Sequence, residues 1–202
     1  SYLLTKHASK PHVTYEQLRK YSQGLIALTA GSAGIVNKLI LTGNQDEAYK
    51  ALEELNSIFP EHIYVEISRH NLLHEEEAEG ALLEFSDKLN IPIIATNLVM
   101  FEEPSKFKAH DTLLCIAQGS YVAVEERKTS NKEYYFKSSS EMAKLFADLP
   151  EAIENTMQLA ERCSVMAESS APMMPAFAEN AQLEAEAIKE QSYAGLKARF
   201  DA

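Results

Sequence analysis

The chain has 202 residues, of which 19 are Lys or Arg and 30 are Asp or Glu, so its net charge is −11. Hydrophobic residues make up 46%, which supports a buried core and excludes a disordered chain. A protein that grips a phosphate backbone needs clustered Lys and Arg, so we expect no DNA binding through this acidic chain. No run of about 18 apolar residues occurs, and we expect no membrane association.

The two cysteines and the first residues bear on the compartment. Cys115 and Cys163 are far apart and lack the spacing of a metal site, which predicts reduced thiols in a cytosolic protein. The opening residues contain no apolar stretch of signal-peptide type. We therefore expect a cytoplasmic location. Position 1 is Ser1 rather than Met, which suggests a fragment of a longer protein.

Residues 14–96 alternate between helix and strand patterns. Thr14 is a suitable N-cap for a first helix. Residues 46–59 carry apolar side chains at intervals of three and four, which is typical of an amphipathic helix. Residues 63–67 are β-branched or aromatic at alternate positions, which predicts a strand. The predicted elements are helices at 15–21, 35–41, 46–59 and 75–89, and strands at 25–29, 63–67 and 91–95. Strand–helix–strand alternation predicts an α/β fold with neighbouring parallel strands.

After Thr96 the patterns are mainly helical. Residues 119–131 have the pattern of a polar loop with a short β-like run at 121–124, and Pro172 and Pro175 indicate a linker. The predicted helices lie at 106–117, 138–146, 151–163 and 182–199. We therefore divide the chain into a domain at 1–165, a linker at 166–180 and the start of a following region at 181–202.

Several segments resemble, in order, the alpha subunit of bacterial DNA polymerase III. The most specific is LFADLPEAIENT at 145–156, followed by AERC at 160–163. The others are GLIALTAG at 24–31, IYVEISRH at 63–70, IPIIATN at 91–97, AHDTLLCI at 109–116 and GLKARF at 195–200. The resemblance extends over nearly the whole chain. It corresponds to the later part of the N-terminal polymerase-and-histidinol-phosphatase (PHP) domain of that family.

The resemblance implies a fold and a role. The fold would be a partial, truncated βα-barrel of the PHP type with a predominantly helical C-terminal part. The longer protein would be a DNA-directed DNA polymerase of chromosomal replication that uses magnesium, with a proofreading exonuclease subunit and other replisome subunits as partners. DNA would be bound by polymerase domains that this chain lacks. The family's first H-x-H metal ligands would lie upstream and its catalytic carboxylates downstream, so we expect no catalytic residue and no cofactor in this chain.

The resemblance also indicates which metal-ligand positions have been lost. The family often has Cys where this chain has Gly31, and Asp-x-His where it has Leu98 and Met100. Glycine and leucine carry no donor, and a thioether is a poor ligand for hard or borderline divalent metals. We therefore predict a scaffold or docking region with a degenerate metal site.

Three residues are candidates for a rebuilt metal site. His70 follows a predicted strand, where sites of barrel-like folds lie, and His110 and Asp111 lie early in a helix. Each also has a structural interpretation, in which His70 fixes the loop after it and His110 and Asp111 bond backbone groups or a nearby loop. Glu75–Glu77 is an acidic helix start that favours the helix dipole.

Two other functions remain open from the sequence. The chain could be a PHP-type metal-dependent phosphoesterase or 3'-5' exonuclease, or an interaction module without a polymerase. Truncation would also leave the strand at 25–29 as an unpaired sheet edge. We therefore predict either self-association across that edge or a rearranged sheet.

Overall fold

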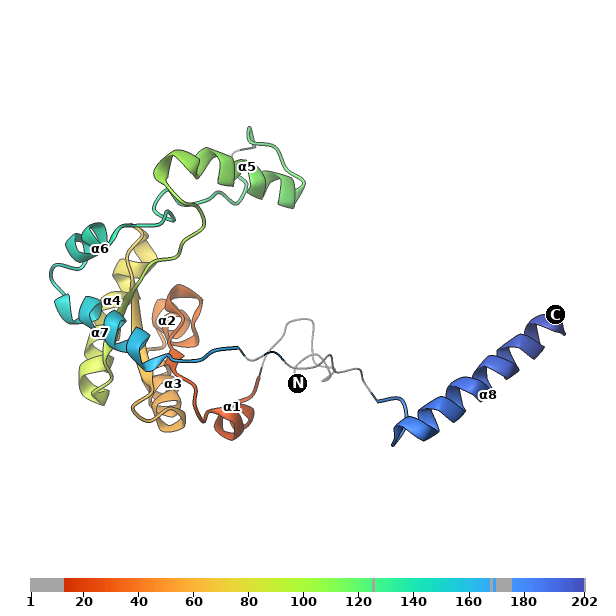
Figure 1. The fold of residues 1–202 in the computed structure, drawn as a ribbon. Helices are drawn as coiled ribbons and strands as arrows, with labels where there is room; N and C mark the ends of the chain where they lie inside the picture. The colour runs from red at the N-terminus through yellow and green to blue at the C-terminus, as the bar shows by residue number, and fades with distance from the viewer. Residues whose placement is uncertain (1–12, 125, 168, 170–175, 202) are drawn as a thin grey trace. The chain divides into compact units, whose positions relative to one another are not determined.

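A computed structural model describes residues 13–124, 126–167, 169 and 176–201 of the chain (Figure 1). Two compact units are present, one formed by residues 1–163 and the other by residues 164–202. Within the described residues, none of the helices has both the length and the apolar character needed to cross a bilayer.

The first unit is built on a small parallel sheet. Its strands are β1 (Ala27–Leu28), β2 (Ile63–Ser68) and β3 (Ile93–Thr96), in the order β1-β2-β3. Ala27 is in register with Ile63 on one side of β2, and Val65 with Ile93 on the other. Helices link the strands, as parallel pairing requires. They are α2 (Ile35–Leu41) and α3 (Gln45–Ile58) between β1 and β2, and α4 (Leu73–Leu89) between β2 and β3.

The core lies between the sheet and these helices. Val36, Leu52 and Val65 are fully buried, and Leu82 is nearly so. They come from α2, α3, β2 and α4, so every layer contributes to one apolar cluster. Phe146, which follows the later helix α6 (Ser139–Leu145), completes the cluster at 0% exposure.

Local signals explain where the helices begin and end. Thr14 and Gln17 form a capping box at α1 (Tyr15–Tyr21), which satisfies two free N–H groups. Ser138 and Glu141 form the same motif at α6 (Ser139–Leu145). Asn90 ends α4 in the left-handed conformation with φ of 50°, a backbone region that Asn tolerates.

The outer edge of β3 is covered by α7 (Pro150–Arg162), which packs against that strand. The Asn155 side-chain amide donates to the Ile93 carbonyl at 2.7 Å. Between β3 and α6 the chain forms the 3-10 turn η3 (Pro104–Lys106), α5 (Phe107–Gln118) and a long loop. A parallel bridge between Phe101 and Tyr135 closes this excursion, so the two ends of the segment lie side by side.

The second unit contains one described helix, α8 (Ala181–Phe200). The Asn180 side chain caps it by accepting from the Leu183 N–H. None of the residues of α8 is buried. Part of the predicted linker, residues 168 and 170–175, lies outside the described residues.

The structure confirms the predicted α/β class, with a small parallel sheet consistent with a partial PHP-type fold. The predicted helices occur within about two residues of their expected ends, the usual scatter of helix boundaries. The strand expected at 25–29 is shorter, because only Ala27 and Leu28 pair as a strand with β2. The β-like run at 121–124 lies in the expected loop and makes no ladder.

Candidate functional site

The carboxyl ends of the three strands surround a cavity of about 220 Å³. The loop after β1 contributes Gly31, β2 contributes Glu66 and Ser68, and the segment after β3 contributes Leu98. Open parallel sheets bind their ligands at this end, because the loops that follow the strands converge there. The cavity is therefore the candidate site of the fold.

Glu66 is the carboxylate that the strands themselves place in the cavity. It interrupts the apolar run of β2, and its side chain is only partly buried. The Thr96 hydroxyl donates to its Oε1 at 2.7 Å, while the Thr29 hydroxyl accepts from its backbone N–H at 2.9 Å. The sequence reasoning missed Glu66, although a single acidic residue in an otherwise apolar strand is the signal that could have identified it.

His70 is buried at the edge of the same cavity, with 2% of its surface exposed. Its Nδ1 lies 2.7 Å from Glu75 Oε1, and its Nε2 accepts from the Leu98 backbone N–H at 3.0 Å. Because Nε2 is an acceptor here, the ring is neutral and Nδ1 carries the proton that it donates to Glu75. The imidazole thus connects the start of α4 to the segment after β3, and both ring nitrogens are engaged.

Glu75 holds the backbone of His70 as well as its ring. The His70 N–H donates to Glu75 Oε2 at 2.5 Å, and Glu75 is 9% exposed. Burial raises the pKa of Glu75, but the hydrogen bonds from the His70 ring and backbone outweigh it, so the pKa lies below its ordinary value. Glu75 is therefore a buried anchor, and it also lies in the acidic first turn of α4 that the sequence predicts.

Tyr134 covers the histidine from the long loop. Its ring packs edge-on against the His70 ring, with centroids 5.0 Å apart. Burial, and then the charge of Glu75, raise the pKa of Tyr134. The Asn131 side-chain amide donates to the His70 carbonyl at 2.9 Å, so the loop at 131–134 is fixed onto the histidine from two sides.

The structure favours glycine at the two positions after β1, Gly31 and Gly34, for different reasons. Gly34 has no room for a side chain, because an added Cβ would lie 1.8 Å from the Thr29 carbonyl oxygen. Gly31 has φ of +46°, and an added Cβ would lie 3.3 Å from Ser68 Oγ and 3.9 Å from Glu66 Cδ. A side chain at position 31 would therefore point toward the Glu66 carboxylate, but from a strained backbone.

Of the other two positions that the resemblance predicts to be degenerate, only Leu98 lines the cavity. The Met100 side chain is 49% exposed, and its backbone N–H donates to the Tyr134 carbonyl at 2.8 Å. The structure thus brings Gly31 and Leu98 to one cavity and leaves Met100 outside its lining.

His110 and Asp111 lie on α5 and do not line the cavity. His110 Nδ1 bonds Ser130 Oγ at 2.8 Å. Asp111 forms a bidentate pair with Arg127 at 2.8 and 2.5 Å, and this pair lowers the pKa of Asp111. Both residues fasten the loop at 127–130 to α5, and the structure does not group them with His70.

The side chains that line the cavity do not suit the ligation of a divalent-metal cluster. Glu66 is bonded to Thr96, Glu75 and His70 satisfy each other, and Gly31 and Leu98 offer no side-chain donor. Among the described residues, no group of three or more His, Cys, Asp or Glu side chains could hold a metal ion. The arrangement stabilises the loops at the carboxyl end of the sheet.

Comparison with known proteins agrees with the fold and with the resemblance found in the sequence. The family described as PHP domain matches residues 1–70. The DNA polymerase III subunit alpha of Caulobacter vibrioides is 39% identical over 202 residues, which is 100% of this chain and 18% of that protein. The chain is related to one segment of DNA polymerase III alpha subunits. The Rickettsia bellii subunit is 41% identical over 190 residues, 94% of this chain and 16% of that protein.

A more distant relative gives the same result. The Pseudomonas aeruginosa DNA polymerase III subunit alpha is 34% identical over 186 residues, or 91% of this chain and 16% of that protein. The resemblance to the alpha-subunit segment is thus confirmed along the chain. The chain spans less than a fifth of the length of these relatives.

Proposed function

We propose that this chain is a scaffold and docking segment of a replicative DNA-directed DNA polymerase III alpha subunit, acting in chromosomal DNA replication in the bacterial cytoplasm. The similarity to named alpha subunits over the whole chain supports the parent role. The engaged His70–Glu75 pair at the carboxyl end of the sheet is the observation that carries the scaffold role. By this proposal the longer protein uses magnesium and extends DNA through domains outside this chain.

The docking part of the proposal concerns proteins rather than DNA. With a net charge of −11 the chain repels a phosphate backbone. We infer that its partners are the proofreading exonuclease subunit and other replisome subunits. Copurification of that exonuclease with the 202-residue chain, and its loss in a chain unfolded by core substitution, would support this role. Equal recovery on an unrelated acidic protein would contradict it.

Metal analysis tests the scaffold role directly. The purified chain is incubated with zinc or manganese, passed through a desalting column and measured by plasma mass spectrometry. We expect far less than one metal ion per chain, and no hydrolysis of a phosphodiester substrate with either metal. One tightly held ion per chain together with turnover would instead favour the alternative, a PHP-type phosphoesterase or 3'-5' exonuclease that uses Glu66.

A variant that restores donors provides the matched comparison. Gly31→Cys, Leu98→Asp and Met100→His together supply the side chains that the family often has at these positions. Gly31 and Leu98 line one cavity with Glu66, so we expect the triple variant to retain more zinc than the natural chain. Equal zinc retention by both chains at one ion or more would contradict the proposed loss of the site.

A further inference from the structure

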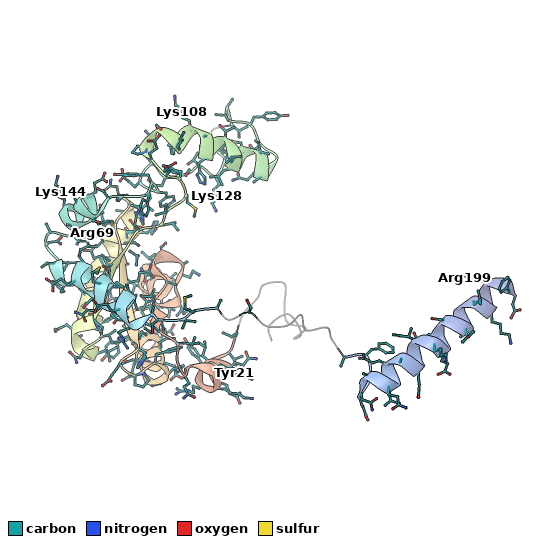
Figure 2. The ribbon with its side chains drawn as sticks, in the orientation of Figure 1. Tyr21, Arg69, Lys108, Lys128, Lys144 and Arg199 are labelled. Carbon is teal, nitrogen blue, oxygen red and sulfur yellow. The ribbon has the colours of Figure 1, made fainter. Side chains whose placement is uncertain are left out.

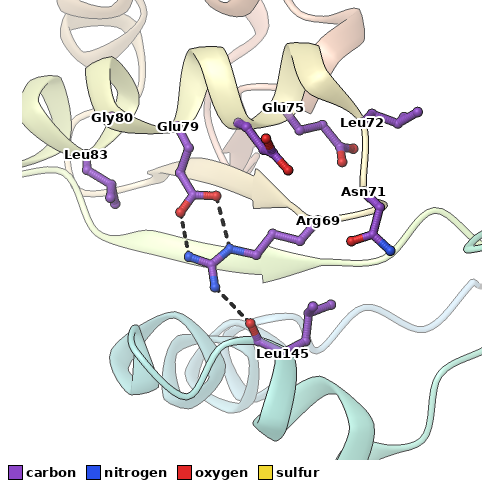
Figure 3. A pocket seen from close by; sticks show the side chains of 9 residues that line it. Arg69, Asn71, Leu72, Glu75, Glu79, Gly80, Leu83 and Leu145 are labelled. Atoms are coloured by element: carbon purple, nitrogen blue, oxygen red, sulfur yellow. Dashed lines mark hydrogen bonds and ion pairs between the residues drawn. The ribbon is translucent and has the colours of Figure 1, made fainter.

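A second groove lies between α4 and α6 and shares one lining residue, Glu75, with the cavity at the carboxyl ends of the strands. Figure 3 shows this groove from close by. Its volume is about 460 Å³. Leu72 and Leu83 from the α4 side and Leu145 from the end of α6 supply its apolar walls. All three leucines are partly buried rather than covered, so an apolar side chain of a partner could still reach them.

Gly80 opens the middle of this groove. It lies on the same stripe of α4 as Glu76 and Leu83, since residues three and four apart share a helix face. Gly80 is exposed, and a Cβ added there would meet no atom within 4 Å. Glycine destabilises a helix interior relative to alanine, and neither packing nor a positive φ requires it at this position. The missing side chain leaves space where the groove is lined by helix backbone.

The cation in the groove is already satisfied. Arg69 donates to Glu79 at 3.0 and 2.5 Å, to Asp148 at 2.7 and 2.8 Å and to the Leu145 carbonyl at 2.8 Å. These five bonds use every N–H of the guanidinium, and its plane lies over the Phe146 ring with 4.8 Å between Cζ and the centroid. Arg69 therefore has no donor left for an anionic ligand.

The charge that remains around the groove is negative. Arg69 offsets only one of the two carboxylates that it binds, Glu79 and Asp148. Glu76 also lines the groove, is exposed, and takes part in no ion pair among the residues that the structure describes. Apolar walls with a negative rim fit an apolar side chain flanked by cations. This charge complementarity also raises the rate of association with such a partner.

We propose that the groove between α4 and α6 is a docking site for a basic protein segment, in which a leucine-sized side chain lies over Gly80 between the leucine walls and a flanking Lys or Arg pairs with Glu76. Glu76, Gly80 and the three leucines do not line the cavity at the carboxyl ends of the strands, so their test does not depend on whether that cavity holds a metal. Affinity comes from the apolar anchor, and the cation sets the choice of partner.

A peptide titration of the 202-residue chain tests this site. The probe is a fluorescein-labelled GSRLRSG peptide, and GSELESG and GSRSRSG are its acidic and anchor-free counterparts. With leucine methyl groups isotopically labelled, we expect the basic peptide to shift the resonances of Leu72, Leu83 and Leu145 at low salt. The other two peptides should bind at least about tenfold more weakly, and added salt should lower the affinity of the basic peptide.

Substitutions in α4 separate docking from folding. Gly80→Leu fills the groove from an exposed helix position, so the variant should melt no lower than the natural chain and lose at least about tenfold in affinity. Glu76→Gln should lower the affinity for the basic peptide about two- to fivefold. Glu77→Gln, also exposed but outside the groove lining, is the control and should change nothing.

The contrary outcomes are specific. Binding of the peptide to folded Gly80→Leu with unchanged affinity would overturn the proposal, as would equal binding of the acidic peptide. Leucine shifts that depend on the concentration of the chain alone would assign the groove to a second copy instead. Peptide-induced shifts confined to leucines outside the groove would also overturn it.

Discussion

Replacing Glu75 with alanine tests whether the His70–Glu75 pair holds the carboxyl end of the sheet. The substitution leaves two buried donors of His70 without an acceptor, the ring Nδ1–H and the backbone N–H. A hydrogen bond to a charged group contributes about 1.5–3 kcal/mol, and the two bonds share one carboxylate and so are not additive. We expect the free energy of unfolding to fall by about 3–4 kcal/mol, which corresponds to a melting shift of about 6–16 °C for a chain of this size.

Urea unfolding followed by circular dichroism measures this change. Glu76→Ala, one residue along the helix and exposed, is the matched control and should stay within about 0.5 kcal/mol of the natural chain. Glu75→Gln keeps one acceptor oxygen and should fall between the two. A loss below about 1 kcal/mol for Glu75→Ala would refute the reasoning, because it would mean that His70 finds other partners at little cost.

Three further predictions follow from the same structure. Hydrogen bonds hold the pKa of Glu75 below its ordinary value, so the stabilisation by its carboxylate is complete above about pH 4.3 and is lost as the pH falls through the folded pKa. The difference in free energy of unfolding between the natural chain and Glu75→Gln should therefore shrink in acid. A constant difference down to pH about 2 would contradict this. Phe146→Ala should cost about 3–5 kcal/mol in urea unfolding, since Phe146 is 0% exposed, whereas Phe136→Ala, at 69% exposure, should cost less than about 0.5 kcal/mol. The natural chain should self-associate through β1 in light scattering, and Leu28→Lys, at a side chain 42% exposed, should make it monomeric; a monomeric natural chain would refute the exposed-edge argument.

The sequence predicted most helices and the parallel sheet, because these depend on local periodicity and caps. Residues 46–59 and 75–89 have apolar spacing that matches α3 and α4 closely. β1 was predicted too long, since the ladder with β2 extends over only Ala27 and Leu28 and hydrophobicity alone does not set the length of pairing. The β-like run at 121–124 likewise forms no strand in the expected loop, because it has no partner strand.

The site was less accessible to sequence reasoning. The position of His70 after a strand indicated its place in the fold, but the role of Glu75 depends on a turn that brings α4 back over the end of β2. The hydrogen bond from the Leu98 N–H to His70 joins residues 28 apart in the chain. The periodicity of apolar residues in the sequence does not predict such a bond. The separation of His110 and Asp111 from the cavity likewise depends on where the long α5 excursion lies.

The bond from Asn155 to the Ile93 carbonyl has a consequence for assembly. It satisfies an outward carbonyl on β3, and α7 packs along that strand, so one side of the sheet is closed to further strands. Among the described strands, β1 forms the other edge of the sheet, and a contact that uses the same edge of both copies closes on itself as a twofold pair. Strand addition through β1 would therefore stop at two copies rather than continue into a fibre.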